Sequence, residues 1–410
     1  MKIWMCSLAL FAVGMMAAAE LSPCPGVPVT LMDAARKNIA NRPVIQTRLH
    51  ISRQGLDAVL KEPHWNVVED KPLVPASKDP HDYMSMGTYW WPDPSKPDGL
   101  PFIHRDGYPN PASAKLDNFK VNKMLLKLSR LAGLAYFDSN KAAGECAAEQ
   151  LRVFFLNPAT RMNPHLKYSQ GIPGICDGRP SGLIDGYYFA EIADYIGMLD
   201  QAGFLSASDM QGLRKWYADF GHWLRTDPIS ETDRNASHNH GFAYQIMVIV
   251  CAEMAGDRET AVLHARRIPR LIRRAIRDDG AMIMEMVRPT SWDYHIFAMR
   301  MVMQHCALLQ SLGIDLLAPD SDCGKRIRAT LDFLCRTAQD TKTWPFKQVQ
   351  KFRVDYLGGL LMRMYTMTGE ARWKVYYDQL QTPKGNMLAE YFFSPDGWHS
   401  FTQVPPVKAK

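Results

Sequence analysis

The feature that most constrains the fold of this chain is a succession of apolar segments whose hydrophobic residues recur at helical spacing. In the segment 116–137, Leu125, Leu128 and Leu131 lie three residues apart and would share one helix face. Most later segments come in pairs with short connections, which is typical of antiparallel helical hairpins. The expected helices span residues 116–137, 144–155, 183–203 with 208–224, 241–255 with 258–277, 294–312 with 325–338, and 350–368 with 371–381, and a shorter helix is expected at 31–41.

This pattern predicts an all-α chain. Strands do not alternate with helices, which excludes a doubly wound sheet. Successive hairpins form either an open solenoid or a closed toroid, and the absence of a fixed 34-residue period argues against TPR repeats. With 410 residues, of which 47% are hydrophobic, the chain is long enough for two or three domains or for one large helical array.

Residues 1–19 are typical of a secretory signal peptide. Lys2 precedes a short apolar run that ends in an A-A-A box, so we predict cleavage after the box and export of residues 20–410 to the periplasm. The apolar run is too short to span a bilayer, and Cys6 lies too early for a lipoprotein anchor. We therefore expect no membrane anchor.

The charge and the cysteines restrict the possible partners. A formal net charge of +6 suits an anionic substrate, but the basic residues are scattered and no nucleic-acid-binding motif is present, so we expect no nucleic acid. The cysteines show no C-x-x-C and no zinc spacing, so we expect neither a metal ion nor a cofactor. Cys323 and Cys335 could form a disulfide in an oxidising compartment, which the sequence leaves open.

Two polar loops interrupt the helical pattern. Residues 74–111 are dense in proline, glycine and aromatic residues, and a long loop of this kind is usually functional. Its Tyr89, Trp90 and Trp91 form either a platform that stacks on sugars or an arm that packs onto the body. The second loop, 157–179, contains N-P-H-L-K-Y-S-Q-G-I-P-G.

The stretch N-A-S-H-N-H-G-F-A-Y-Q at residues 235–245 runs directly into an apolar helical segment. This places Asn239 and His240 at a helix N-terminus, where unpaired backbone N–H groups favour an anion. An imidazole and a carboxamide there could hold a carboxylate and move a proton beside it. The alternative is a simple helix cap, but the density of polar side chains favours a site.

A second constellation, 279–295, contains Arg288 and Tyr294 close to the start of another helix. A guanidinium can hold a carboxylate through two hydrogen bonds. A nearby arginine would lower the pKa of the tyrosine phenol and let it exchange protons. The structural alternative is an ion pair between Arg288 and Glu285.

Taken together, four motifs resemble those of the alginate-lyase superfamily of polysaccharide lyases, most closely family 38 and more distantly family 5. They are D-P-H-D-Y-M-S-M-G-T-Y-W-W-P-D-P-S-K-P-D-G, N-P-H-L-K-Y-S-Q-G-I-P-G, N-H-G-F-A-Y-Q and D-G-A-M-I-M-E-M-V-R…Y-H, in matching order over residues 75–350. The resemblance implies an (α/α) toroid, an incomplete barrel of about six or seven helical hairpins in a single catalytic domain over residues 20–410. It also implies metal-independent β-elimination on a β-1,4-linked polyuronate such as alginate or glucuronan.

The resemblance also assigns catalytic residues. Asn239 and His240 match the family's Asn-His pair, Arg288 matches its arginine, and Tyr294 matches its catalytic tyrosine. Asn239 and Arg288 would neutralise the substrate carboxylate, His240 would assist or act as base, and Tyr294 would protonate the leaving oxygen. Many relatives carry asparagine where this chain has His238, so either imidazole could face the sugar.

Further residues are candidates for substrate binding because they lie in the polar loops or beside the catalytic motifs. They are Tyr89, Trp90, Trp91, Asn163, Tyr168, Gln170, Arg179, His238, Tyr244, His295, Trp344 and Lys347. Asp233 is a candidate for orienting the histidine. The expected partner is an anionic polysaccharide, and the protein itself would be a monomer or a weak oligomer.

Two rival functions fit a helical array. A glycoside hydrolase would need two carboxylates that flank the scissile bond, and no pair lies in a stretch that looks built around it. The carboxylates available are Asp79, Asp82, Asp185, Glu231, Asp233 and Glu285. A non-catalytic glycan-binding protein of helical-repeat type is the other rival.

Overall fold

The computed structural model describes residues 36–41 and 43–380, together with residue 25. The prediction of a mostly helical chain is confirmed. The α-helices are α2 (Pro43–Arg53), α3 (Leu56–Leu60), α4 (Asp117–Asp138), α5 (Lys141–Leu151), α6 (Tyr187–Gln201), α7 (Ala207–Thr226), α8 (Glu231–Asn235), α9 (Asn239–Ala255), α10 (Arg258–Ala265), α11 (Ile268–Ala275), α12 (Ser291–Ser311), α13 (Asp322–Gln339), α14 (Leu357–Thr368) and α15 (Ala371–Gln379).

The remaining elements are short. The 3₁₀ segments are η1 (Ile39–Asn41), η2 (Pro111–Lys115), η4 (Pro180–Gly186), η5 (Pro228–Ser230), η6 (Thr341–Thr343) and η7 (Val354–Tyr356), and η3 (Arg152–Leu156) is a π-helical turn that continues α5. The strands are β1 (Met84–Met86), β2 (Trp90–Trp91), β3 (Ile103–His104) and β4 (Tyr168–Gly171).

Helix bounds agree with the sequence predictions to within about three residues except at four places. In the segment expected as a helix from residue 183, residues 183–186 belong to the 3₁₀ segment η4 and α6 begins at Tyr187. The segment expected as one helix over 258–277 is divided into α10 and α11, because Pro269 stands at the second position of α11 and cannot continue a helix from α10. The segment 350–368 becomes helical only at Leu357. The early helix expected at 31–41 lies partly outside the described residues, and its end is the 3₁₀ segment η1.

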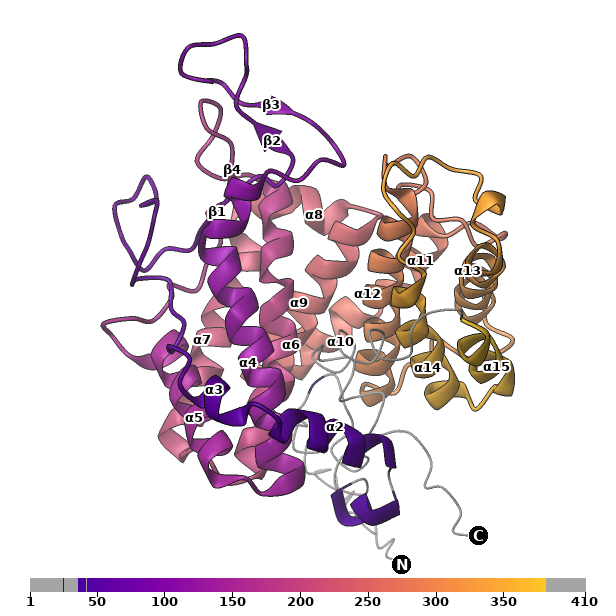
Figure 1. The fold of residues 1–410 in the computed structure, drawn as a ribbon, viewed down its shortest axis with the longest axis horizontal. Coiled ribbons are helices and arrows are strands. Elements are labelled where there is room, and N and C mark those ends of the chain that lie inside the picture. The colour runs from indigo at the N-terminus through magenta and orange to yellow at the C-terminus, as the bar shows by residue number, and fades with distance from the viewer. Residues whose placement is uncertain (1–24, 26–35, 42, 381–410) are drawn as a thin grey trace, which may run out of the picture.

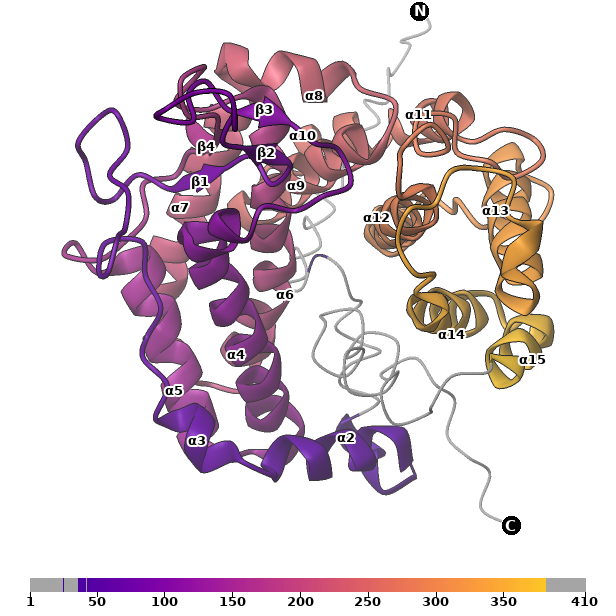
Figure 2. The same cartoon turned by 45° about the horizontal axis from the view of Figure 1, so that its top comes forward.

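Figure 1 shows the helices standing side by side, with the four strands and their loops gathered at one end of the molecule. In Figure 2 the helices α11 to α15 lie on one side and α4 to α7 on the other. Helix α9 packs against α6, α7, α10, α11 and α12, and thereby joins the two groups. The N-terminus of α9 points toward the end that carries the strands.

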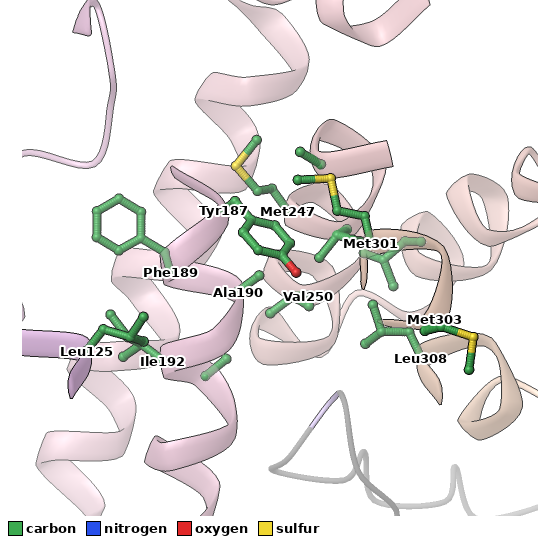
Figure 3. Packing of buried hydrophobic residues seen from close by; sticks show 14 of the residues in the cluster. Leu125, Tyr187, Phe189, Ala190, Ile192, Met247, Val250, Met301, Met303 and Leu308 are labelled. Carbon is green, nitrogen blue, oxygen red and sulfur yellow. The ribbon is translucent and has the colours of Figure 1, made fainter. Parts of the chain in front are cut away.

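Helix α9 is buried on all sides. Its sequence is apolar all round, and every residue except His240 and Ala255 is buried. Figure 3 shows part of the core that results, to which α9 contributes Met247 and Val250, α6 contributes Tyr187, and α12 contributes Met301. A helix that is hydrophobic on every face belongs in the centre of a large core, and this one fixes the position of its own N-terminus.

The two polar loops are held together at the end that carries the strands. Strand β1 pairs in parallel with β4, and β2 pairs with β3 in antiparallel orientation. Asn163 Nδ2 donates to Asp82 Oδ1 at 2.7 Å and to Asp79 Oδ2 at 3.0 Å, which adds a side-chain link between the loops. The loops at 74–111 and 157–179 therefore form one layer above the helix ends.

The cysteines within the described residues are all free. Cys251 and Cys306 are buried thiols. The structure excludes the disulfide between Cys323 and Cys335 that the sequence left open. Both residues lie in α13, and twelve residues of helix separate them by about 18 Å.

No helix in the described part of the chain is long and apolar enough to cross a membrane. The predicted signal peptide, residues 1–19, lies outside the described residues.

Gly241 is required where α9 begins, because a Cβ at this position would lie 2.1 Å from the backbone oxygen of Ala236. We expect Gly241→Ala to lower the free energy of unfolding by about 1–3 kcal/mol, since backbone must move. The matched control is Gly212→Ala in α7, where the added carbon meets only the end of the Leu156 side chain. Urea denaturation of both variants tests this, and equal stabilities would contradict it.

Candidate active site

The N-terminus of α9 carries two histidines with different contacts. His238 caps the helix, since its Nδ1 accepts from the backbone N–H of His240 at 3.3 Å. His240 Nδ1 lies 3.1 Å from Oδ2 of the buried Asp233. This carboxylate accepts the Nδ1 proton and so fixes the tautomer and the ring, which leaves Nε2 as the basic nitrogen.

His238 stays neutral in this environment. Burial and, next, the neighbouring His240 lower the pKa of His238 to about 4. Its Nδ1 is already engaged in the helix cap. The contacts therefore favour His240 over His238 as the imidazole that exchanges a proton.

Asn239 is held by the carboxylate of Glu285, the residue that the sequence offered as an alternative partner of Arg288. Glu285 Oε1 accepts from the Asn239 backbone N–H at 2.9 Å, and the two Glu285 oxygens lie 3.0 and 2.9 Å from Asn239 Nδ2. Asn239 is 2% exposed and Glu285 1%. The Arg288–Glu285 ion pair, which was the structural alternative, is thus absent, and the Asn239 carboxamide positions the start of α9 rather than facing solvent.

Arg288 lies between a carboxylate and a phenol. Its Nε and Nη2 donate to the two oxygens of Asp106 at 3.1 and 2.8 Å, and Nη2 also donates to Tyr294 Oη at 2.6 Å. The guanidinium carbon lies 3.7 Å from the centre of the Tyr294 ring. Tyr294 Oη in turn lies 3.1 Å from Tyr89 Oη.

The pKa of Tyr294 differs from the sequence prediction. Arg288 does act to lower it, but burial is the larger effect and raises the pKa of Tyr294 well above its ordinary value, with Tyr89 adding to the rise. The phenol is therefore protonated at neutral pH. For Asp106, burial alone would raise the pKa, but the hydrogen bond and charge of Arg288 bring it below its usual range.

A third group of polar residues comes from the two loops. Gln170 accepts from Arg179 Nη2 at 2.7 Å and donates to Asp185 at 3.1 Å, and Ser85 Oγ donates to the same carboxylate at 2.5 Å. Burial raises the pKa of Asp185, against the hydrogen bonds that it accepts. Tyr89 of the first loop bonds Tyr294 near the start of α12, and Glu285, three residues before Arg288, bonds Asn239 at the start of α9, so the loops and the two helix starts adjoin one another.

The three neighbouring aromatic residues do not form a common platform. Tyr89 contacts Tyr294, Trp90 lies against His104 with ring centres 5.1 Å apart, and Trp91 donates to the backbone oxygen of Tyr108. Alternation along β2 places the two tryptophans on opposite faces of the ribbon.

Two N–H donors beside this site have no acceptor among the described residues. They are Trp90 Nε1 and Arg179 Nε, and both are buried. The Arg179 guanidinium carbon lies 5.9 Å from the Trp90 ring. Both atoms have almost no exposed surface, so they are unsatisfied donors inside the loop layer and do not form a surface that is open to a ligand.

Three residues proposed for substrate binding lie in the core instead. Tyr244 is buried, and its hydroxyl donates to the backbone oxygen of Leu224. His295 is fully buried, with both ring nitrogens bonded to backbone groups of Ser291 and Met282. Trp344 is buried and donates to Ser291. The substrate-binding predictions for these three residues are wrong, because a sequence motif does not reveal which way a side chain points.

Three other candidates have different surroundings. Asn163 is occupied by its bonds to Asp79 and Asp82, so it joins the loops. Tyr168 is half-buried on β4, and Lys347 is exposed.

The sequence analysis missed the roles of Asp106, Asp185 and Glu285. Asp106 precedes Gly107, and this Asp-Gly turn signal in a polar loop is the only hint that the sequence contains. Each of the three carboxylates contacts residues far away in the chain. Within the described residues, no group of three or more His, Cys, Asp or Glu side chains could hold a metal ion.

The family model for alginate lyase matches residues 66–344. The chain belongs to the alginate lyase family. It is therefore a polysaccharide lyase, and neither the glycoside hydrolase nor the non-catalytic binding protein fits this assignment. No curated protein matches the chain.

Solved structures of alginate lyases are similar over almost the whole chain. A lyase from Bacteroides ovatus shares 29% identity and covers 93% of this chain and 99% of its own, with a TM-score of 0.82. Alginate lyase A1-III from Sphingomonas species A1 shares 14% identity. The match covers 88% of this chain and 92% of A1-III, with a TM-score of 0.56. A histidine-to-alanine variant of A1-III in complex with a tetrasaccharide shares 14% sequence identity. The match covers 96% of this chain and 98% of the variant, with a TM-score of 0.59. The likeness to A1-III shows the fold alone.

The two imidazoles can be separated by substitution. We expect His238→Asn to keep most of the turnover, because an asparagine oxygen can cap α9 in place of Nδ1. We expect His240→Asn to lower kcat about a hundredfold or more, because it removes the imidazole that Asp233 orients. Steady-state kinetics of both variants on one polymer tests this, and the reverse order would assign the chemistry to His238.

Proposed function

We propose that this lyase cleaves alginate by β-elimination within its β-1,4-linked mannuronate-rich chains and releases products with an unsaturated uronate end. The proposal rests chiefly on one observation, the protonated Tyr294 phenol held by Arg288 at the site that also contains His240. An acid, a base and a fixed positive charge are the three groups that this elimination needs.

The reaction removes the proton on C5 of the uronate and breaks the bond between C4 and O4. His240 is placed to accept the C5 proton through Nε2, and Tyr294 to give its proton to the departing O4. The electron pair of the C5–H bond becomes the C4=C5 double bond. A mechanism in which Tyr294 itself takes the C5 proton would need an ionised phenol, which burial disfavours.

Negative charge that develops on the uronate carboxylate needs a donor beside it. Arg288 uses Nε and both Nη2 donors for Asp106 and Tyr294, so the two N–H groups on Nη1 remain for a carboxylate. Asn239 is engaged with Glu285 and acts as a positioning residue in this proposal.

Several finer features are part of the same proposal. The helices would form the incomplete (α/α) toroid of polysaccharide lyase family 38, in a single catalytic domain over residues 20–410. Removal of residues 1–19 would export the enzyme to the periplasm, where it would act as a monomer or a weak oligomer.

The central test is Tyr294→Phe, followed by the ultraviolet absorbance of the unsaturated product on polymannuronate, polyguluronate and glucuronan. We expect turnover on polymannuronate to fall about a hundredfold or more while polymer binding persists, because only the donated proton is lost. Tyr217→Phe is the matched control, since its hydroxyl lies in the core and donates to the backbone oxygen of Phe189. A Tyr294→Phe enzyme with near wild-type kcat would refute the assignment.

We also expect activity to survive exhaustive chelation, because Arg288 supplies the positive charge that a metal ion would otherwise provide. Wild-type rates after EDTA treatment and desalting are the measurement. Loss of activity that a divalent ion restores would contradict metal independence.

A further inference from the structure

A second positively charged site lies beside the active site, between α8 and α11. It is a pocket of about 470 Å³, and four of its eight lining residues are arginines. The lining consists of Arg234, Asn235, Ala236, Gln245, Arg267, Arg270, Leu271 and Arg274. None of these residues is acidic.

The arginines share one face of a helix. Arg267, Arg270 and Arg274 follow one another at spacings of three and four, so α11 presents them in a single row. Ile268, Leu271, Ile272 and Ala275 bury the helix against the core. The row is thereby fixed toward the pocket.

These three guanidinium groups have no hydrogen bond or ion pair with any residue that the structure describes. Other arginines nearby do: Arg277 pairs with Asp279 at 2.8 Å, and Arg326 with Asp278 at 2.5 Å. Like charges at helical spacing repel one another. An anion in the pocket would relieve this repulsion.

The opposite wall supplies two fixed groups. Arg234 Nη2 donates to the backbone oxygen of Arg225 at 2.7 Å, and Arg234 Nε lies 3.3 Å from Tyr244 Oη, so this guanidinium is anchored. Gln245 is only 4% exposed, and its Oε1 accepts from His264 Nδ1 at 2.7 Å. Its Nε2 has no acceptor among the described residues.

The pocket is close to the catalytic groups along the chain. Arg234 follows Asp233, which holds His240, and Ala236 lies two residues before His238. Two successive residues of α8 therefore serve the two sites: Asp233 contacts His240, and Arg234 lines the arginine pocket.

We propose that this arginine pocket binds uronate carboxylates of a long substrate chain at a second place, outside the cleavage site. The inference rests on the proposed function. A guanidinium matches a carboxylate through two hydrogen bonds, the volume suits a sugar-sized ligand, and an alginate chain carries a carboxylate on every ring. Binding at two places raises the apparent affinity for long chains only.

The test compares two double variants with the same change in charge. Arg270→Gln/Arg274→Gln removes two lining arginines, and Arg266→Gln/Arg273→Gln removes two exposed arginines that do not line the pocket. We expect the first to raise KM on long polymannuronate about three- to tenfold. Its kcat, and its KM on a tetrasaccharide, should stay at wild-type values. An equal rise in KM for the control variant, or none for either, overturns the proposal.

Direct binding separates this inference from the proposed activity. Both double variants are combined with Tyr294→Phe and titrated with long polymannuronate, with and without inorganic phosphate as competitor. Weaker polymer binding in the pocket variant alone supports the proposal, even if the wild type forms no unsaturated product. Equal polymer binding in both variants overturns it, and phosphate binding lost only in the pocket variant would then assign the site to a free phosphate.

Discussion

The structure depends on the burial of nearly all of α9. A helix that is apolar on every face can lie only in the middle of the core, so α6, α7, α10, α11 and α12 pack around it. Its N-terminus is then fixed at the end of the molecule that carries the loops. The only half-buried residue of its first four turns is His240, and this places a reactive imidazole at the edge of a rigid core.

The functional groups at that edge are held by carboxylates from distant parts of the chain. Asp233 holds His240, Glu285 holds Asn239, and Asp106 holds Arg288. Each of these contacts fixes a side chain before substrate arrives, which reduces the ordering that binding must impose. Glu285 is buried, so its charge depends on the hydrogen bonds of Asn239.

The active site and the arginine pocket differ in whether their arginines have acidic partners. At the active site Arg288 is matched by Asp106, so its charge is partly balanced and its geometry is fixed. In the arginine pocket the row on α11 has no acidic partner among the described residues. The first arrangement suits a residue that stabilises a transition state, and the second suits attraction of a polyanion.

The sequence by itself determined the helical class, most helix bounds, and the place of Asn239 and His240 at a helix N-terminus, because hydrophobic periodicity and caps are local properties. It also singled out His240, Arg288 and Tyr294 as candidate catalytic residues, through motifs. Only the tertiary structure decided that Tyr244, His295 and Trp344 face the core, and that Glu285 holds Asn239 instead of Arg288. It also decided that burial outweighs Arg288 at the Tyr294 phenol. These outcomes depend on which distant residues meet and how far water is excluded, and no local pattern encodes either.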